Sequence, residues 1–321
     1  MAFDLTREPG NRIPVLVAGW PGMGNVGLAA VEYLRRKLDA RLCARLDITD
    51  CVFPEAIEVE QGIGRLQVPA PQALYLVEEP PLLLFEGSLQ PGGRAGARIA
   101  DELIEFARAH GVETVYTGAA FATPMSFRDE VQVFGVSTAD RLRDGFVALG
   151  VQPLGEGRIS GLNGLLLGLA AHRGLAGTCF LATMPHYAVQ TPNPKASRAL
   201  VRVFERLLNT GIDTDDLDRE VEQVDQLLGK FESRVNAALS DLRARLEGNA
   251  ESDESEEGDD RETPVPEPRE MMERIERLFA AACADRGKAR ELKRELDRWG
   301  LFGAYEDRFL DLFSSDRRQH D

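Results

Sequence analysis

The stretch that decides the fold covers residues 15–27 and reads Val15-Leu16-Val17-Ala18-Gly19-Trp20-Pro21-Gly22-Met23-Gly24-Asn25-Val26-Gly27. It begins as an unbroken apolar run, which is typical of a strand covered on both faces. A glycine turn follows, and after it comes a helical pattern rich in alanine. A strand that leads through a tight glycine turn into a helix is the first unit of a parallel α/β sheet.

The glycines of this turn match a phosphate-binding motif only in part. Gly22, Gly24 and Gly27 have the Gly-x-Gly-x-x-Gly spacing of dinucleotide sites, and the amides of a helix N-terminus can hold an anion. The acidic residue expected at the end of the second strand is missing, because Asp39 precedes that strand and Asp47 lies inside it. The Gly-Lys-Ser/Thr end of a P-loop is missing too. The pattern therefore favours a close-packed strand–helix turn that needs small residues over a nucleotide site.

The bulk composition argues against several classes of partner and site. The chain has 321 residues, a net charge of -15 and 43% hydrophobic residues. Phosphate binding relies on clustered Lys and Arg, so the sequence predicts neither nucleic-acid nor membrane binding. The four cysteines form no Cys-x-x-Cys pair, which argues against zinc and redox motifs and against a disulfide framework. We expect no metal and no cofactor. No signal peptide or spanning apolar segment is evident, which predicts a cytoplasmic protein.

Residues 13–210 alternate between strand and helix patterns. The predicted strands cover 13–19, 42–48, 74–78, 81–85, 114–120, 131–136 and 178–182. The predicted helices cover 26–38, 95–110, 138–149, 161–172 and 195–208, and glycines follow several of them as C-terminal caps. Right-handed crossovers then give a three-layer α/β/α domain with a mostly parallel sheet, which we place at residues 1–212.

A long amphipathic helix is predicted over residues 213–247. Its apolar positions alternate between spacings of four and three, which is a heptad stripe: Leu217, Val221, Val224, Leu228, Phe231, Val235, Ala238 and Leu242. Such a seam must be buried, either on its own domain or on another copy of the chain. Self-association through Leu217, Val221, Val224, Leu228, Phe231 and Val235 and packing within the chain are left as equal alternatives.

The remaining sequence divides into a linker and a small helical unit. Residues 248–268 combine acidic residues with three prolines and few apolar ones, which predicts a disordered acidic linker. After it, apolar residues at helical spacing predict a small helical hairpin over 269–321. This hairpin is too short to form much core by itself.

Six residues at predicted strand exits and helix starts are candidates for a ligand pocket. They are Gly22, Gly24, Asn25, Asn163, His186 and Lys195. Ligands of open α/β sheets bind at the carboxyl ends of the strands, where these residues are expected to converge. His186 has no evident carboxylate or nucleophile partner, so a loop histidine bonded to the main chain is favoured over a general base. A solvated Lys195 is likewise the simpler interpretation, and we assign no catalytic residue.

Four ordered motifs together resemble the PAC2 family, the proteins related to proteasome assembly chaperone 2. They are residues 19–25, Gly161-Leu162-Asn163-Gly164, Met184-Pro185-His186-Tyr187 and Pro192-Asn193-Pro194-Lys195-Ala196. The resemblance covers roughly residues 10–245 and is specific at the level of the family, and we place the chain in its bacterial branch. It implies a nucleoside-phosphorylase-like α/β sandwich that forms homo-oligomers, and proteasome subunits as partners in some relatives. Archaeal members are similar in ending with a hydrophobic residue, a tyrosine and one more residue, whereas this sequence ends Arg318-Gln319-His320-Asp321.

Two functions are consistent with these observations. The first is a non-enzymatic, homo-oligomeric scaffold or proteasome-assembly-chaperone-like factor that binds other proteins. The alternative is a phosphorylase- or hydrolase-like enzyme, or a binder of a small anion such as phosphate or a nucleotide, with its pocket at the strand ends.

Overall fold

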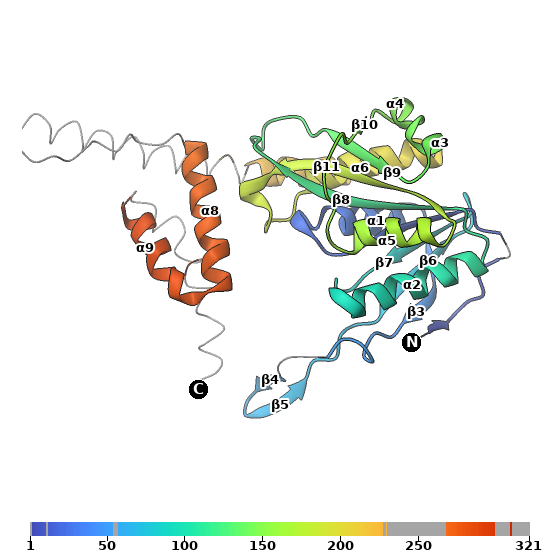
Figure 1. Cartoon of the computed structure of the whole chain (residues 1–321), viewed down its shortest axis with the longest axis horizontal. Helices are drawn as coiled ribbons and strands as arrows, with labels where there is room; N and C mark the ends of the chain where they lie inside the picture. The colour runs from blue at the N-terminus through green and yellow to red at the C-terminus, as the bar shows by residue number, and fades with distance from the viewer. Residues whose placement is uncertain are drawn as a thin grey trace, which may run out of the picture. The chain divides into compact units, whose positions relative to one another are not determined.

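The computed structural model describes residues 2–10, 12–53, 57–226, 229, 268–298 and 309 (Figure 1). The chain divides into two compact units, Met1–Val224 and Asp225–Asp321. The first unit contains the α/β domain. The predicted linker and most of the predicted hairpin's second half lie outside the described residues.

The first unit is built on a nine-stranded mixed sheet in the order β1-β3-β6-β7-β2-β8-β11-β9-β10. The strands are β1 (Phe3–Leu5), β2 (Val15–Gly19), β3 (Arg41–Leu46), β6 (Gln72–Val77), β7 (Leu82–Glu86), β8 (Thr114–Thr123), β9 (Val133–Ser137), β10 (Gln152–Pro153) and β11 (Ala176–Pro185). The four central strands, β7, β2, β8 and β11, are parallel to one another. Towards one side, β6, β3 and β1 pair antiparallel, and on the other side β9 pairs antiparallel with β11.

Helices cover both faces of this sheet (Figure 1). On one face, α1 (Val26–Lys37) and α6 (Pro194–Leu208) contribute Val31, Leu34, Leu200 and Phe204 to a buried cluster. On the other face, α2 (Gly93–Ala109) and α5 (Leu162–His172) contribute Ile99, Leu103 and Leu166 to a second cluster. The predicted three-layer α/β/α class is thereby confirmed.

Several local features differ from the prediction. The helix expected over 138–149 is two short helices, α3 (Asp140–Arg143) and α4 (Phe146–Leu149), separated by Asp144 and Gly145. Strands β1 and β10 were not predicted. Nor was a separate antiparallel hairpin, β4 (Ile57–Glu60) and β5 (Ile63–Leu66), which projects from the body of the first unit (Figure 1).

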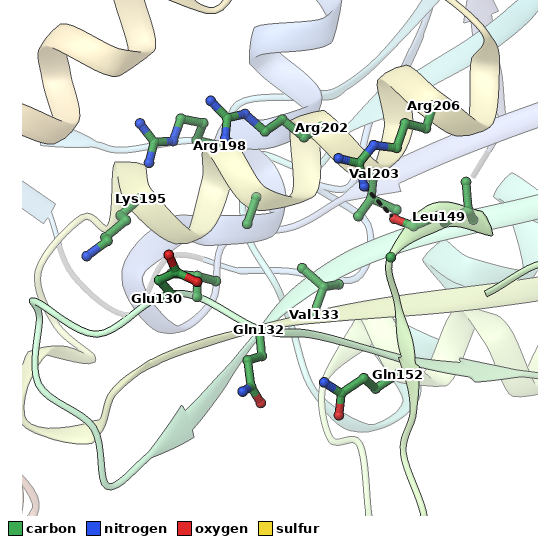
Figure 2. Close-up of a pocket in the computed structure, with 13 residues that line it drawn as sticks. Glu130, Gln132, Val133, Leu149, Gln152, Lys195, Arg198, Arg202, Val203 and Arg206 are labelled. Carbon is green, nitrogen blue, oxygen red and sulfur yellow. Dashed lines mark hydrogen bonds between the residues drawn. The ribbon is translucent and has the colours of Figure 1, made fainter. Parts of the chain in front are cut away.

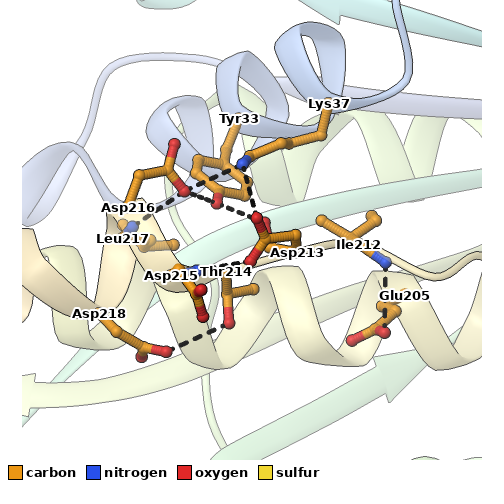
Figure 3. A network of polar contacts seen from close by, with 10 residues as sticks. All are labelled: Tyr33, Lys37, Glu205, Ile212, Asp213, Thr214, Asp215, Asp216, Leu217 and Asp218. Carbon is orange, nitrogen blue, oxygen red and sulfur yellow. Dashed lines mark hydrogen bonds and ion pairs between the residues drawn. The ribbon is translucent and has the colours of Figure 1, made fainter.

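The predicted amphipathic helix is described over residues 215–226. Leu217 is buried in the same cluster as residues of α1 and α6, and Val221 is buried as well. Polar contacts fasten the start of this helix to α1 through Tyr33 and Lys37 (Figure 3). The first two positions of the heptad stripe are therefore buried within the first unit. Val224 is half-buried, and Leu228, Phe231 and Val235 lie outside the described residues.

The second unit contains α8 (Pro268–Ala284), a short 3-10 helix η3 (Arg286–Lys288) and α9 (Ala289–Arg298). Ile275 and Phe279 of α8 and Leu292 and Leu296 of α9 are buried. An ion pair of 2.9 Å joins the guanidinium of Arg274 to the carboxylate of Glu295. The predicted C-terminal helical extension is confirmed. None of the helices in the described residues combines the length and apolarity needed to cross a membrane.

Candidate functional site

The turn between β2 and α1, called here the glycine corner (residues 19–27), needs glycines because α1 packs very closely against the sheet. A Cβ atom on Gly27 would lie 2.0 Å from the main-chain oxygen of Gly118 in β8, and one on Gly19 would lie 2.9 Å from the side chain of Val31. Neither position can carry a side chain without displacing backbone or core atoms. The preferred interpretation of this stretch, a close-packed strand–helix turn, is therefore supported by the geometry.

The glycine corner also contacts the segment that follows β11. A short 3-10 helix η1 (Met23–Asn25) links β2 to α1, with Gly24 and Asn25 in the left-handed region at φ of 57° and 52°. The amide of Gly24 donates to the carbonyl of Val189 at 2.8 Å, and its carbonyl accepts from the amide of Asn193 at 2.9 Å. Asn193 in turn caps α6, because its side-chain oxygen accepts from the amide of Ala196 at 2.9 Å. Gly24 and Asn25 thus shape the connection between two strand exits.

Asn163 joins the corner to α5 from inside the fold. Its side-chain oxygen accepts from the amide of Trp20 at 3.2 Å, and its carbonyl accepts from the hydroxyl of Thr117 at 2.8 Å. Gln90, which sequence reasoning missed, completes this link: its side chain accepts from the amide of Leu162 at 2.6 Å and donates to the carbonyl of Pro21 at 2.9 Å. No local pattern marks Gln90, because its two partners lie far away in the sequence.

His186 and Lys195 both hold the loop that follows β8. A ring nitrogen of His186, in the 3-10 helix η2 (His186–Ala188), lies 2.9 Å from the carbonyl of Thr123. The ammonium of Lys195 donates to the carbonyl of Phe127 at 2.7 Å, and the Phe127 amide donates to the hydroxyl of Tyr187 at 3.0 Å. The favoured role of His186, a loop histidine bonded to the main chain, agrees with this contact.

Two cavities lie beside these residues. The first, called here the edge cavity, has a volume of about 280 Å³. Gly22 and Asn163 line it together with Trp20, Gln90, residues 119–121 of β8 and the loop 154–161. Its charged lining groups, Glu156 and Arg158, are of opposite sign.

The second cavity, called here the α6 groove, has a volume of about 410 Å³ and runs along α6 (Figure 2). Its lining comprises Glu130, Val131, Gln132, Val133, Leu149, Gly150, Gln152, Lys195, Arg198, Ala199, Arg202, Val203 and Arg206. Lys195 is the predicted site residue that lines it. The six candidates thus share the carboxyl edge of the sheet, but Gly22 and Asn163 line one cavity and Lys195 the other. Gly24, Asn25 and His186 line neither of the two.

The buried thiols are not reactive groups. Burial raises the pKa of the Cys43 thiol to about 12 and that of Cys179 to about 11, so both remain protonated at neutral pH. Both side chains are fully buried and pack as small hydrophobic residues. Among the described residues, no group of three or more His, Cys, Asp or Glu side chains is arranged to hold a metal ion.

Comparison with known proteins agrees with this architecture. The family model for the PAC2 family matches residues 16–232. The chain belongs to the PAC2 family. An uncharacterised protein of Methanocaldococcus jannaschii is 26% identical over 237 residues, covering 72% of this chain and 88% of the relative.

Solved structures of PAC2-like proteins have the same fold. The proteasome-assembly chaperone homologue of Mycobacterium tuberculosis is similar with a TM-score of 0.56 and 25% identity, covering 67% of this chain and 94% of that one. PbaB of Pyrococcus furiosus, an archaeal proteasome activator, is similar with a TM-score of 0.61 and 21% identity, covering 71% and 97%.

The stretches that carry the PAC2 resemblance meet at one edge of this sheet. Trp20 of the first stretch bonds Asn163 of the second, and a Cβ on Gly24 would lie 2.9 Å from the Met184 side chain of the third. Asn193 of the fourth bonds Gly24 directly. In this PAC2 chain the four stretches therefore contact one another. Most of their polar groups form hydrogen bonds that fix the loops at this edge of the sheet.

Proposed function

We propose that this chain is a non-enzymatic, protein-binding factor with a role like that of the proteasome-assembly chaperones. Membership of the PAC2 family supports this proposal, as does similarity to a proteasome-assembly chaperone homologue. The observation that carries it is the exposed apolar face of the β4–β5 hairpin.

One face of this hairpin is apolar and is exposed to solvent. The register pairs Ile57 with Leu66 and Val59 with Gly64, so three large apolar side chains share one face. The other face carries the pair Glu58–Arg65. All three apolar side chains are exposed, at 57%, 57% and 58% of their surface.

Such a face stabilises the hairpin only when something covers it. A two-stranded hairpin alone is marginally stable in water, and clustered exposed apolar groups mark sites of protein binding. Burying a Val, Leu or Ile side chain fully is worth about 1.5–3 kcal/mol, so a partner that covers the face gains substantial affinity. We infer that partner proteins, with proteasome subunits as the first candidates, bind here.

The test is capture of purified proteasome subunits by the full-length chain. Leu66→Ser should weaken capture by at least about tenfold, because it removes apolar area from the binding face. Ile63→Ser is the matched control, since Ile63 lies on the same strand with similar exposure but pairs with Glu60 on the opposite face. Equal capture by both variants, or no capture by the wild-type chain, would contradict the proposal.

We further propose that the chain forms homo-oligomers, and that the later positions of the heptad stripe, from Val224 to Val235, contribute the contact. Val224 is the first stripe position that the domain leaves half-buried. A cytoplasmic location stays a prediction.

A second candidate function is binding of a small anionic ligand in the edge cavity. The cavity favours this because it lies at the carboxyl ends of parallel strands and is lined by Gly22 and Asn163 of the predicted pocket. A thermal-shift screen with phosphate and nucleotides tests it. A ligand at one hundred times its dissociation constant should stabilise the fold by about 2.7 kcal/mol. Unchanged melting temperatures throughout would exclude these ligands.

A further inference from the structure

The α6 groove concentrates positive charge in a strongly acidic chain. Four cationic side chains, Lys195, Arg198, Arg202 and Arg206, line it, against the single carboxylate of Glu130 (Figure 2). The whole chain has a net charge of -15. A local excess of one sign in a cavity focuses the electrostatic field there and attracts ligands of the opposite sign.

The two ends of this cationic row have neutral partners. Lys195 donates to the carbonyl of Phe127, and a guanidinium nitrogen of Arg206 donates to the carbonyl of Leu149 at 2.9 Å. In the middle of the row, Asp218 pairs with Arg198 and lies 3.8 Å from a guanidinium nitrogen of Arg202. One carboxylate thus serves two arginines. Positive charge at both ends is left for a ligand to neutralise.

The spacing of the row fits an extended peptide. From Lys195 to Arg206 the helix rises about 16 Å, at 1.5 Å per residue. An extended strand covers that distance in about five residues, and its alternate side chains lie about 7 Å apart on one side. Successive cations on α6 are three or four residues apart, about 4.5–6 Å along the axis. Acidic side chains at alternate positions of a peptide can therefore reach successive cations.

The walls of the groove also suit a peptide better than a small enclosed ligand. Arg202 is 49% exposed at its side chain, so the groove is open to solvent. Val133, Leu149 and Val203 provide apolar surface between the charged groups. A pocket for a small molecule would bury most of its ligand, whereas an open row of cations matches the recognition of acidic motifs by arginine clusters.

We propose that the α6 groove binds an acidic, extended peptide segment of a partner protein. This rests on the proposed protein-binding function and adds the chemistry of one recognised segment. Arginine and lysine would form charge-assisted hydrogen bonds with the carboxylates of the segment.

The experiment measures binding of a fluorescent peptide of alternating glutamate and alanine to the full-length chain by anisotropy. The groove variant is Lys195→Gln/Arg202→Gln/Arg206→Gln. The control variant, Arg12→Gln/Arg41→Gln/Arg143→Gln, removes the same charge from exposed arginines outside the groove, whose surface ion pairs contribute little stability. Thermal unfolding verifies that both variants fold.

The expected result is binding to the wild-type chain that weakens by at least about tenfold in the groove variant and by less than about twofold in the control. Binding should also weaken as salt is raised, and a peptide of alternating glutamine and alanine should not bind. Equal binding to both variants overturns the proposal. So does tighter competition by tripolyphosphate or by an oligothymidylate than by the acidic peptide, because the site would then recognise a different polyanion.

The peptide experiment can fail without contradicting the proposed function, and the two failures can be told apart. If the acidic peptide fails to bind while proteasome subunits are still captured through the hairpin face, only the groove assignment is lost. If the wild-type chain captures no subunit, the proposed function fails whatever the peptide does.

Discussion

At the scale of single residues, the most demanding contact is between Gly27 and Gly118. Here a helix and a strand approach so closely that the main-chain oxygen of one occupies the space of a Cβ atom on the other. The requirement is steric and concerns backbone atoms, so side-chain rearrangement cannot relieve it. The glycine pattern that resembles a nucleotide motif is thus explained by packing at this position.

Gly27→Ala should lower the free energy of unfolding by about 3 kcal/mol. The added methyl group would clash with main-chain atoms of β8, and only a shift of the backbone could make room for it. Urea unfolding followed by circular dichroism measures it. Gly168→Ala is the control: Gly168 lies exposed within α5, and a Cβ there meets nothing within 4 Å. That variant should be neutral or up to about 1 kcal/mol more stable. Similar losses in both variants would show that the Gly27 contact is looser than described.

At the scale of elements, the helix over residues 215–226 is fastened at its start by carboxylates. The hydroxyl of Tyr33 contacts the carboxylate of Asp216 and lies 2.8 Å from the carbonyl of Asp213, while the ammonium of Lys37 lies 3.1 Å from Asp216 (Figure 3). The hydrogen bond from Tyr33 and the charge of Lys37 lower the pKa of Asp216 to about 2. Arg198 and Asp218 join the same helix to α6.

The lowered pKa of Asp216 predicts a pH dependence. The Asp216 carboxylate stabilises the fold above its unfolded pKa of about 3.9, and this contribution is lost as the pH falls towards 2. Asp216→Asn should therefore be less stable than wild type at neutral pH, by about 0.5–1 kcal/mol because the pair is partly exposed. The difference should shrink as the pH falls through 2, because Asp216 becomes protonated in the folded state as well.

Thermal unfolding between pH 7 and pH 2 measures this difference, and amide exchange over residues 217–226 reports whether the helix start loosens. Asp215→Asn removes the same charge from a neighbouring exposed side chain and should change neither measurement. A difference between Asp216→Asn and wild type that persists unchanged at pH 2 would contradict the assigned cause.

Most elements were predictable because their signals are local. β2, β8 and β11 are buried apolar runs, and Asn193-Pro194 marks the start of α6 with a side-chain cap and a proline in the first turn. The β4–β5 hairpin also carries a local signal, the alternation Ile57-Glu58-Val59-Glu60 before Gln61-Gly62. The antiparallel pairing of β9 with β11 and the division of the site between two cavities depend on packing between distant segments. No local pattern encodes either of them.

At the scale of the whole molecule, burial of the heptad stripe decreases along its first three positions. Leu217 and Val221 are buried in the first unit, whereas Val224 is only half-buried. Under the proposed self-association, the later positions of the stripe would pack against the identical positions of a second copy of the chain.

Phe231→Glu combined with Val235→Glu should lower the mass of the oligomer measured by light scattering, because charges in an apolar seam oppose its burial. Gln223→Glu combined with Gln226→Glu adds the same charge at exposed positions of the same segment and should leave the mass unchanged. A wild-type chain that already has the mass of one copy would rule out self-association at this seam.

The outer strands of the main sheet have a consequence for how such chains can meet. β1 has three residues and β10 has two, one of them Pro153, which has no amide hydrogen to donate. Neither edge strand offers a template long enough for a strand of another chain, so edge-to-edge pairing of sheets from different copies is disfavoured on both sides. We therefore expect a partner to contact side-chain surfaces such as the exposed face of the β4–β5 hairpin rather than an edge of the main sheet.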